Sequence, residues 1–380
     1  MSVYLDHNAT TPVDRRVFEA MLPYLQQHYG NPSALYRRGR YARQAVETAR
    51  EQVAQLVNAH PSQVVFTSGG SEANGLAIWG AIPNMHSLAV SAVEHASVLE
   101  SAQAVARQGV KLGIVAVDVD GRVTESALAS ALAHQPQLVS VMVANNETGV
   151  VQDIAQLALL SHAHGALFHT DAVQAAGKMV LDFKSLGVDL MTLSAHKFYG
   201  PKGVGALICD SRVELTPQIL GGGQERGMRS GTENVAAIVG FGKAAELAGC
   251  ELDIRQSHVS GLRSSLEQQL AQMGEVVVFA QQVQRLPNTV FLAIPGIDGE
   301  TLLMELDRMN IEVSSGSACD SRKIGPSHVL LAMGIDELIA RCSIRISFGR
   351  DSSESDVTAL VSALKQQVET LQSASLLAWV

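Results

Sequence analysis

The stretch Ser194-Ala195-His196-Lys197-Phe198-Tyr199-Gly200-Pro201-Lys202-Gly203 decides the fold and the chemistry of this chain. The apolar residues 190–193 before it and 204–209 after it are typical of buried strands, and Gly-Pro-Lys-Gly marks a turn. A lysine at the mouth of such a turn can face a pocket, where its ε-amine can form a Schiff base with a carbonyl compound. A solvated turn lysine is the alternative for Lys197 taken alone, so the rest of the chain has to decide.

Further polar residues follow apolar runs, which predicts that they gather at one edge of a sheet. Residues 64–67 read as a strand that leads into Ser68-Gly69-Gly70-Ser71 and then a helix, an outline that suits a bound phosphate. Alternating strands and helices predict an α/β fold, a mostly parallel sheet with helices on both faces. Functional groups of such sheets lie at the carboxyl ends of the strands. The residues in this position are Ser68, Ser71, His95, Asn146, Asp171 and Lys197.

The second half of the chain changes character after a polar loop at 221–234 that opens with three glycines. Residues 235–273 have a helical pattern, and short strands are predicted at 276–279 and 289–292. A strand of alternating apolar and polar residues is predicted at 343–350, and a helix at about 354–371. An earlier helix is expected to start near Asn31-Pro32-Ser33 and to run to about Val57, with its arginines on a solvated face. These elements predict a second, smaller domain.

Composition narrows the class of protein. The chain has 380 residues, of which 47% are hydrophobic and 17% charged, so it can bury a sizeable core. Its net charge of -9 argues against nucleic acid as the main partner, and no apolar run is long enough to span a membrane. The first residues lack the pattern of a signal peptide, and the four cysteines have no metal or redox spacing. We therefore expect a cytoplasmic protein with free thiols.

Five motifs in order along the chain resemble the cysteine desulfurases of the NifS/IscS type, which belong to the class V aminotransferases. The motifs are Tyr-Leu-Asp-His-Asn-Ala-Thr-Thr-Pro at 4–12, Ser-Ala-His-Lys at 194–197, Gly-Met-Arg-Ser-Gly-Thr at 227–232, Ser-Ser-Gly-Ser-Ala-Cys at 314–319 and Ile-Arg-Ile-Ser-Phe-Gly-Arg at 344–350. The resemblance implies the type I fold of pyridoxal 5'-phosphate (PLP) enzymes and a homodimer. It implies a large doubly wound domain over 15–254, and a smaller α+β domain made from 1–14 and 255–380.

The resemblance also implies a role for each matching residue. Lys197 would hold PLP as a Schiff base and later move the Cα proton of the substrate, and His95 would stack on the ring and assist proton transfer. Asp171 would pair with the pyridine nitrogen and keep it protonated, and Gln174 would donate to the phenolic oxygen. The implied phosphate ligands are Gly70, Ser71, Ser194, His196 and, from the partner subunit, Thr232. The implied substrate-binding residues are Asn146, which is also counted with the cofactor site, and Arg345, whose guanidinium matches a carboxylate.

Cys319 is the predicted nucleophile. It precedes a polar stretch with Gly325-Pro326, which suggests an exposed loop, and a thiol needs an accessible site to react as the thiolate. It would take sulfur from PLP-bound L-cysteine as a persulfide, leaving alanine. The residues 320–328 resemble the longer loop of the NifS/IscS group, which predicts activity without an activating partner. Cys209, Cys250 and Cys342 have no such context, and we expect structural or incidental thiols there.

Several alternatives remain at this point. A selenocysteine lyase or another class V aminotransferase would share the PLP residues, and a sulfur-relay scaffold would keep the fold without much turnover. Three nearby histidines, at 162, 164 and 169, lack further ligands at a recognisable spacing, so no metal is predicted. The expected partners are L-cysteine, a second copy of the chain and a sulfur-acceptor protein, which would serve iron–sulfur cluster assembly or another sulfur-modification pathway. Asp6 and Arg350 are expected to hold the small domain together.

Overall fold

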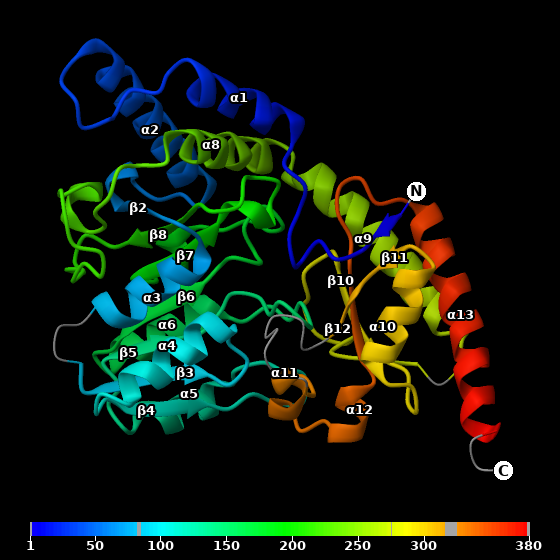
Figure 1. The fold of residues 1–380 in the computed structure, drawn as a ribbon. Helices are drawn as coiled ribbons and strands as arrows, with labels where there is room; N and C mark the ends of the chain where they lie inside the picture. Colours follow the sequence, from blue (N-terminus) through cyan, green and yellow to red (C-terminus); the bar gives the residue numbers. More distant parts are fainter. Residues whose placement is uncertain (1, 82–84, 275, 316–324, 378–380) are drawn as a thin grey trace.

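The computed structural model describes residues 2–81, 85–274, 276–315 and 325–377 (Figure 1). Its largest element is a seven-stranded sheet in the order β2-β8-β7-β6-β5-β3-β4. β8 runs antiparallel to both of its neighbours, and the other neighbouring strands are parallel. The strands are β2 (Val64–Thr67), β3 (Ser87–Ser91), β4 (Lys111–Val115), β5 (Leu138–Ser140), β6 (Leu167–Asp171), β7 (Leu190–Ser194) and β8 (Gly205–Cys209).

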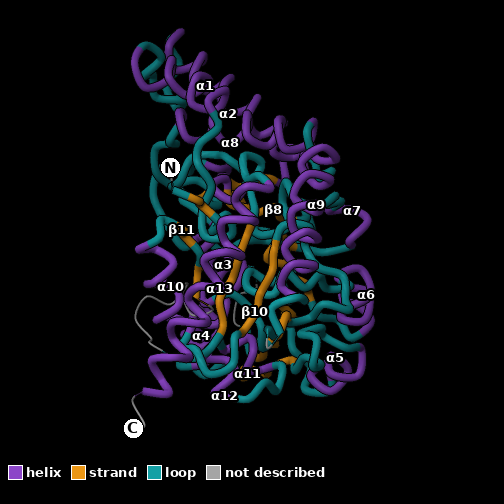
Figure 2. The backbone as a smooth tube through the Cα atoms, turned by 90° about the vertical axis from the view of Figure 1, so that its right-hand side faces the viewer, coloured by secondary structure: helices purple, strands orange, loops and turns teal. Residues whose placement is uncertain are grey.

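Helices cover both faces of this sheet, as an α/β pattern requires. Figure 2 shows α5 and α6 on the side of the strands opposite to α3 and α4. The helices of this part are α1 (Arg15–Gln26), α2 (Arg37–Leu56), α3 (Gly70–Gly80), α4 (Ala96–Ala106), α5 (Glu125–Leu132), α6 (Ile154–Ala163), α7 (Phe183–Leu186) and α8 (Val235–Cys250), with the 3-10 turns η1 (Pro61–Gln63), η2 (Ala195–Lys197) and η3 (Glu225–Gly227). The fold class expected from the sequence is therefore confirmed.

A hydrophobic core lies on each face of the seven-stranded sheet, and successive residues of a strand point alternately into one core and the other. In β8, Ala206 and Ile208 belong to the core under α2, α6 and α8, while Leu207 and Cys209 pack on the side of α3 and α4. Strand side chains point to opposite faces in turn, so a strand covered on both sides has to be apolar throughout. This explains why the strand pattern is so clear in the sequence. Burial of the thiol raises the pKa of Cys209 to about 12, in keeping with a structural role.

The second part contains a four-stranded sheet, in the order β12-β13-β10-β9, and a two-stranded pair of β1 with β11. Figure 1 shows the N-terminal strand beside β11 and α13, far from α1. The strands are β1 (Val3–Tyr4), β9 (Val277–Val278), β10 (Thr289–Ala293), β11 (Ile311–Glu312), β12 (Ser314–Ser315) and β13 (Ser343–Ser347), and the helices are α9 (Leu252–Leu270), α10 (Gly299–Arg308), α11 (His328–Ala332), α12 (Glu337–Arg341) and α13 (Glu354–Leu377). The division at 254/255 stays a prediction, since α9 runs across it without a break.

The predicted start of the helix near Asn31 is wrong, whereas the strand predicted at 343–350 is present as β13. α2 begins at Arg37 and not near Asn31, because Asn31 accepts hydrogen bonds from Ser33 and Ala34 and closes a local turn there. In β13 the apolar and polar residues do alternate, but all five are buried. Ile344 and Ile346 pack in the core of the second part, while Arg345 contacts Asn146 of the large part. Within the described ranges, no helix is long and apolar enough to cross a membrane.

Candidate active site

A cavity of about 200 Å³ opens at the carboxyl ends of the parallel strands. It is bounded by the beginning of α3, the turn after β3, and the residues that follow β5, β6 and β7. The lining residues are Gly70, Ser71, Asn74, His95, Ser97, Met142, Asn146, Asp171, Val173, Gln174, Ser194, His196 and Lys197. Nine of these were predicted from the sequence, and the strand ends bring them together as expected for a doubly wound sheet.

One corner of the cavity has the chemistry of an anion site. The helix α3 begins at Gly70, so its unpaired N–H groups and its positive dipole end face this corner. A Cβ on Gly70 would lie 3.0 Å from Cγ2 of Val173 and 3.5 Å from Cβ of Ser194, so a larger residue would crowd the corner. Ser71, Ser194 and His196 add hydroxyl and imidazole groups. Burial, with the charges of Lys197 and Lys202, lowers the pKa of His196 to about 4.

The carboxylate of Asp171 is fixed at the inner wall. Its Oδ1 accepts the backbone N–H of Val173 at 2.9 Å, and its Oδ2 accepts Nδ2 of Asn74 at 2.7 Å. Sequence reasoning missed Asn74, although a polar residue one helical turn after Gly70 and Ser71 in an otherwise apolar helix was a usable signal. A carboxylate held by two donors is set to meet one further positive or N–H group in the cavity.

A second buried carboxyl, Glu94, lies close to Asp171 and was also missed. Burial, and then the charge of Asp171, raises the pKa of Glu94 well above its ordinary value. Its Oε1 accepts the backbone N–H of Met142 at 2.6 Å. A protonated Glu94 leaves the negative charge of this pair on Asp171.

His95 follows Glu94 and stands at the N-terminus of α4. Its Nδ1 accepts the backbone N–H of Ser97 at 3.1 Å and lies 2.8 Å from the hydroxyl of Ser97. Because Nδ1 is used as an acceptor, the proton of the neutral ring resides on Nε2. The ring is therefore held in one orientation at the cavity wall.

Lys197 ends the 3-10 turn η2 and reaches toward the N-terminal segment. Its Nζ donates to the backbone oxygens of Asn8 and Ala9, both at 2.7 Å. We call residues 6–10 the N-terminal strap, because they cross from β1 to the cavity and join the two parts of the molecule. The amine is thus held by two carbonyl oxygens that can release it to a carbonyl compound in the cavity.

Asn8, at the centre of the strap, is almost fully buried and was not singled out from the sequence. The backbone carbonyl and the side chain of Asn8 bond to the large part. Its backbone N–H and its side chain bond to residues of β10 and β13 and to Asn288 in the small part. Its hydrogen-bond partners are Asn146, Gln174, Lys178, Lys197, Asn288, Thr289 and Ser347. A residue with this many partners fixes the position of Lys197 relative to the second part.

Arg345 reaches the site from β13 and does not line the cavity itself. Its Nη1 donates to the backbone oxygen of Asn146 at 3.0 Å, and its Nη2 lies 2.6 Å from Oδ1 of Asp6. Asp6 therefore does more than hold the small domain, since it orients the predicted substrate-binding arginine. Arg350 has the expected structural contacts, an ion pair with Asp14 and a position over the ring of Tyr199.

Two predicted residues lie elsewhere. Thr232 is exposed on the loop before α8 and is not among the residues that line this chain's cavity. That loop is anchored by the buried pair of Arg50 and Glu225, joined by two hydrogen bonds of 2.8 and 2.9 Å. Cys319 lies outside the described residues, so its predicted role is argued from the sequence alone.

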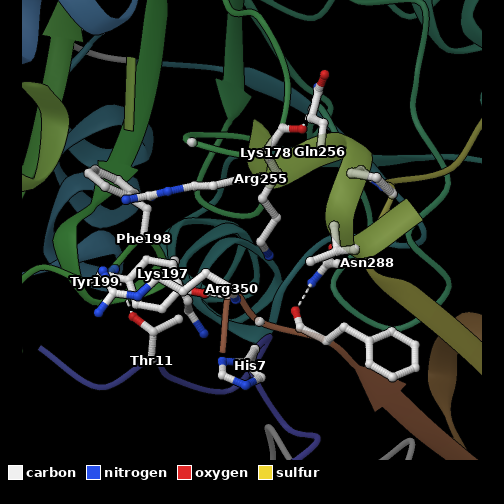
Figure 3. A pocket seen from close by; sticks show the side chains of 15 residues that line it. His7, Thr11, Lys178, Lys197, Phe198, Tyr199, Arg255, Gln256, Asn288 and Arg350 are labelled. Carbon is white, nitrogen blue, oxygen red and sulfur yellow. Dashed lines mark hydrogen bonds between the residues drawn. The ribbon is translucent and has the colours of Figure 1, made fainter. Parts of the chain in front are cut away.

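A smaller cavity of about 30 Å³ lies behind Lys197, between the two parts of the molecule (Figure 3). It is lined by residues of the strap, of α9 and of the segments 177–178 and 348–350. His7 packs at its edge, and burial, with the charge of Lys178, lowers the pKa of His7 to about 4. The wall between the two cavities therefore carries several cations, and Lys197 borders both.

The buried histidines predict how stability depends on pH. His7 has a pKa of about 4, and burial lowers the pKa of His169 to about 3. Both values lie below the unfolded value of about 6.5, so at lower pH the unfolded chain takes up protons that the folded chain does not. His196, whose pKa is also about 4, adds a third group. Stability should be complete near neutral pH and fall between about pH 6 and 4, by about 4 kcal/mol per pH unit for the three groups together.

Urea unfolding at about pH 7 and about pH 5 measures this dependence. A His169→Gln variant should lose roughly a third of it, because one of the three titrating groups is gone. An equal unfolding free energy at both pH values in the unaltered chain would contradict the prediction.

The residues of the large cavity fit PLP. A carboxylate at the inner wall, an amide on Gln174, hydroxyls with a helix N-terminus at one corner and an amine on Lys197 match, in kind, the ring nitrogen, phenolic oxygen, phosphate and aldehyde of that cofactor. The glycine at position 70 provides room where the phosphate would approach the backbone. The donor set also contains an imidazole, His95, at the wall.

Comparison with known proteins places the chain in a family. Residues 3–360 match the family described as Aminotransferase class-V, so the chain belongs to that family. The enzymes of this family that resemble the chain are PLP-dependent, which confirms the cofactor expected from the sequence.

Individual relatives are cysteine desulfurases. The chain is 45% identical over 381 residues to "Cysteine desulfurase IscS" of Anaeromyxobacter sp. (strain Fw109-5), covering 98% of this chain and 94% of that protein. Among solved structures, the "NifS-like protein from Rickettsia africae ESF-5" is 36% identical with a TM-score of 0.90, over 97% of this chain and 100% of the other. The structure "SspA in complex with cysteine" is 32% identical with a TM-score of 0.80, over 92% and 99%. The resemblance to the NifS/IscS type is confirmed.

Proposed function

We propose that this chain is a cysteine desulfurase, which removes sulfur from L-cysteine, forms L-alanine and passes the sulfur on from Cys319. The observation that carries the proposal is the convergence of Asp171, Gln174, Lys197 and the α3 corner on one cavity of suitable size. The names of the relatives support the desulfurase over other PLP enzymes. The role given to each cavity residue is part of the proposal.

Bound PLP supplies an acceptor for the electrons of the bond that breaks at Cα of the substrate. Lys197 holds the cofactor and then moves the Cα proton from the position that the strap gives its Nζ. Asp171 would keep a proton on the ring nitrogen of the cofactor, and His95, at the cavity wall, would stack on the ring and exchange protons through Nε2. Asn146 and Arg345 orient the substrate carboxylate, with Asp6 fixing the guanidinium.

Cys319 takes the sulfur. Its thiolate attacks Sγ of the substrate, the Sγ–Cβ bond breaks, and Cβ takes up a proton, so that alanine and a persulfide result. Acceptor proteins then receive the sulfur for iron–sulfur clusters or another sulfur modification. The length of the segment 320–328 supports turnover without an activating partner, and a cytoplasmic location is proposed from the sequence.

A homodimer is part of the proposal. Large apolar side chains stand exposed along α1, the following loop and the start of α2. They are Phe18, Leu25, Tyr29, Leu35, Tyr36 and Tyr41. An exposed group of this kind is typical of a protein interface. A second copy would cover it and would bring its own Thr232 to the phosphate corner of this chain's cavity.

Release of sulfide and alanine from L-cysteine, with a thiol reductant and added PLP, tests the proposal. We expect equimolar sulfide and alanine, and no turnover when the cofactor is removed. Strong preference for L-selenocysteine would favour the lyase alternative, and transfer of the amino group to a 2-oxo acid would favour an aminotransferase. A PLP-loaded protein that releases neither product would contradict the proposal, and absence of a borohydride-reducible PLP adduct would favour the scaffold alternative.

A further inference from the structure

Lys178 is a partly exposed lysine whose amine lies in the interior, and the mechanism above does not use it. It stands four residues after Gln174, and its backbone oxygen accepts Nε2 of Gln256 at 2.7 Å, which attaches this turn to α9. Figure 3 shows its side chain extending between Arg255 and Asn288 into the small cavity behind Lys197. It therefore approaches the cofactor cavity from the back of the wall.

The ammonium of Lys178 ends on two amide oxygens. Nζ lies 2.8 Å from Oε1 of Gln174 and 2.9 Å from Oδ1 of Asn8. Oδ1 of Asn8 also accepts Nδ2 of Asn288 at 3.0 Å. Both amides belong to the network that surrounds Lys197, since Nε2 of Gln174 and Nζ of Lys197 donate to the same backbone oxygen, that of Asn8.

An ammonium group determines which way these amides are turned. Nζ of Lys178 donates to both amides, so the atom of Gln174 that meets it is the amide oxygen. The NH₂ end of Gln174 then points the other way. One of its hydrogens goes to the backbone oxygen of Asn8, and the other is left for the cavity that Gln174 lines. The backbone oxygen of Asn8 favours the same orientation, because it can only accept, so without Lys178 this one contact is left to hold the amide.

The position is unfavourable for a cation, which argues against an incidental lysine. Burial, and then the charges of Lys197 and Arg345, lowers the pKa of Lys178 well below its ordinary value. A buried ammonium is usually less stable than an apolar side chain of the same size, so its presence points to a use other than stability.

We propose that Lys178 is a positioning residue that holds the amide of Gln174 with an N–H toward the cofactor cavity. The inference rests on the proposed function, in which that N–H meets the phenolic oxygen of PLP. Lys178 contacts neither cofactor nor substrate in this arrangement and acts through Gln174. The same contact holds the side chain of Asn8, so the strap that receives Lys197 is oriented by the same group.

The test compares Lys178→Met with the unaltered enzyme in a PLP titration of the cofactor-free protein, followed by fluorescence and absorbance. Methionine has a similar shape and no donor, so Oε1 of Gln174 loses its partner and the amide is held only through the backbone oxygen of Asn8. We expect PLP to bind about 10- to 100-fold more weakly, the usual effect of one hydrogen bond to a charged partner. We also expect the absorption band of bound PLP to shift, because the phenolic oxygen loses its donor.

Three further variants make the test specific. Lys178→Gln keeps an N–H donor without charge, so its affinity for PLP should fall between those of the unaltered enzyme and Lys178→Met. Lys184→Met removes an exposed lysine and should change nothing. In a cycle with Gln174→Leu, the double variant should bind PLP no more weakly than Gln174→Leu alone, since Lys178 acts through that amide.

The outcomes separate this inference from the proposed function. If the unaltered enzyme binds no PLP, the proposed function fails. If it binds PLP and Lys178→Met shows the same affinity and absorption band, the positioning role is wrong and the proposed function stands. Additive losses in the cycle would assign Lys178 a general structural role and would overturn the inference as well. Should Lys178→Met fail to fold, the same comparisons are made with Lys178→Gln.

Discussion

Replacing Lys197 with alanine is expected to lower desulfurase activity by at least about 10⁴-fold, because the variant loses both the covalent attachment of PLP and the group that moves the Cα proton. The structure offers no substitute amine among the described residues. Lys178 borders the same wall, but its Nζ is held by Gln174 and Asn8 on the far side. Alanine and sulfide release from L-cysteine measures the activity.

Borohydride reduction of the PLP-loaded protein provides an independent readout for this variant. Peptide mapping should find the reduced adduct at Lys197 in the unaltered enzyme, and no adduct in the variant. Lys111→Ala, which removes an exposed lysine from β4, serves as the control and should behave as the unaltered enzyme. An adduct at another lysine, or activity reduced only a few fold, would contradict the assignment of Lys197.

Replacing Cys319 with serine is expected to abolish sulfide release, by at least about 10³-fold, while PLP still binds. A serine hydroxyl is far less nucleophilic than a thiolate and cannot form a persulfide. The described residues that line the cavity lie between 70 and 197 and include the groups proposed to hold PLP. We therefore expect cofactor binding and transfer of sulfur to be separable in this chain.

Two measurements distinguish these steps in the Cys319→Ser variant. Exchange of the Cα proton of L-cysteine with D₂O should continue, because Lys197 performs it, whereas mass spectrometry should find no persulfide on the protein. Cys250→Ser changes an exposed thiol at the end of α8 and should leave both steps intact. Undiminished sulfide release from Cys319→Ser would remove the persulfide route and point to a different PLP lyase.

The sequence alone predicts those strands that helices cover on both faces. Strands covered on both faces are apolar throughout, and the polar residues after them stand out for that reason, so the large sheet and most of the cavity could be predicted. The alternating pattern also predicted β13 as a strand, but it did not show what its polar residues contact. In the structure they are buried against the large part, where Arg345 meets Asn146. Arg345 and Asn146 lie some 200 residues apart in the sequence, and a contact between such distant residues produces no periodic pattern of apolar residues.

The residues that support the site were missed for a related reason. Asn8 and Asn74 act by holding predicted residues, Lys197 and Asp171, and Glu94 acts on Asp171 through its charge. Lys178 reads as an ordinary turn lysine until the fold buries it. An asparagine or a lysine is commonly found at the surface, so the partners of Asn8 and Lys178 become evident only in three dimensions.

The strap also has a consequence for how the enzyme is made. Asn8 leaves the ribosome early, yet its partner Ser347 lies 339 residues later in the chain. At a synthesis rate of about 5 to 20 residues per second, the first residues wait for roughly 15 to 70 seconds before their partners exist. The sheet of the large part can form in that interval, but the hydrogen-bond network of the strap around Lys197 cannot be completed. A nascent chain should therefore acquire its cofactor stably only after the segment with β13 has emerged, late in translation.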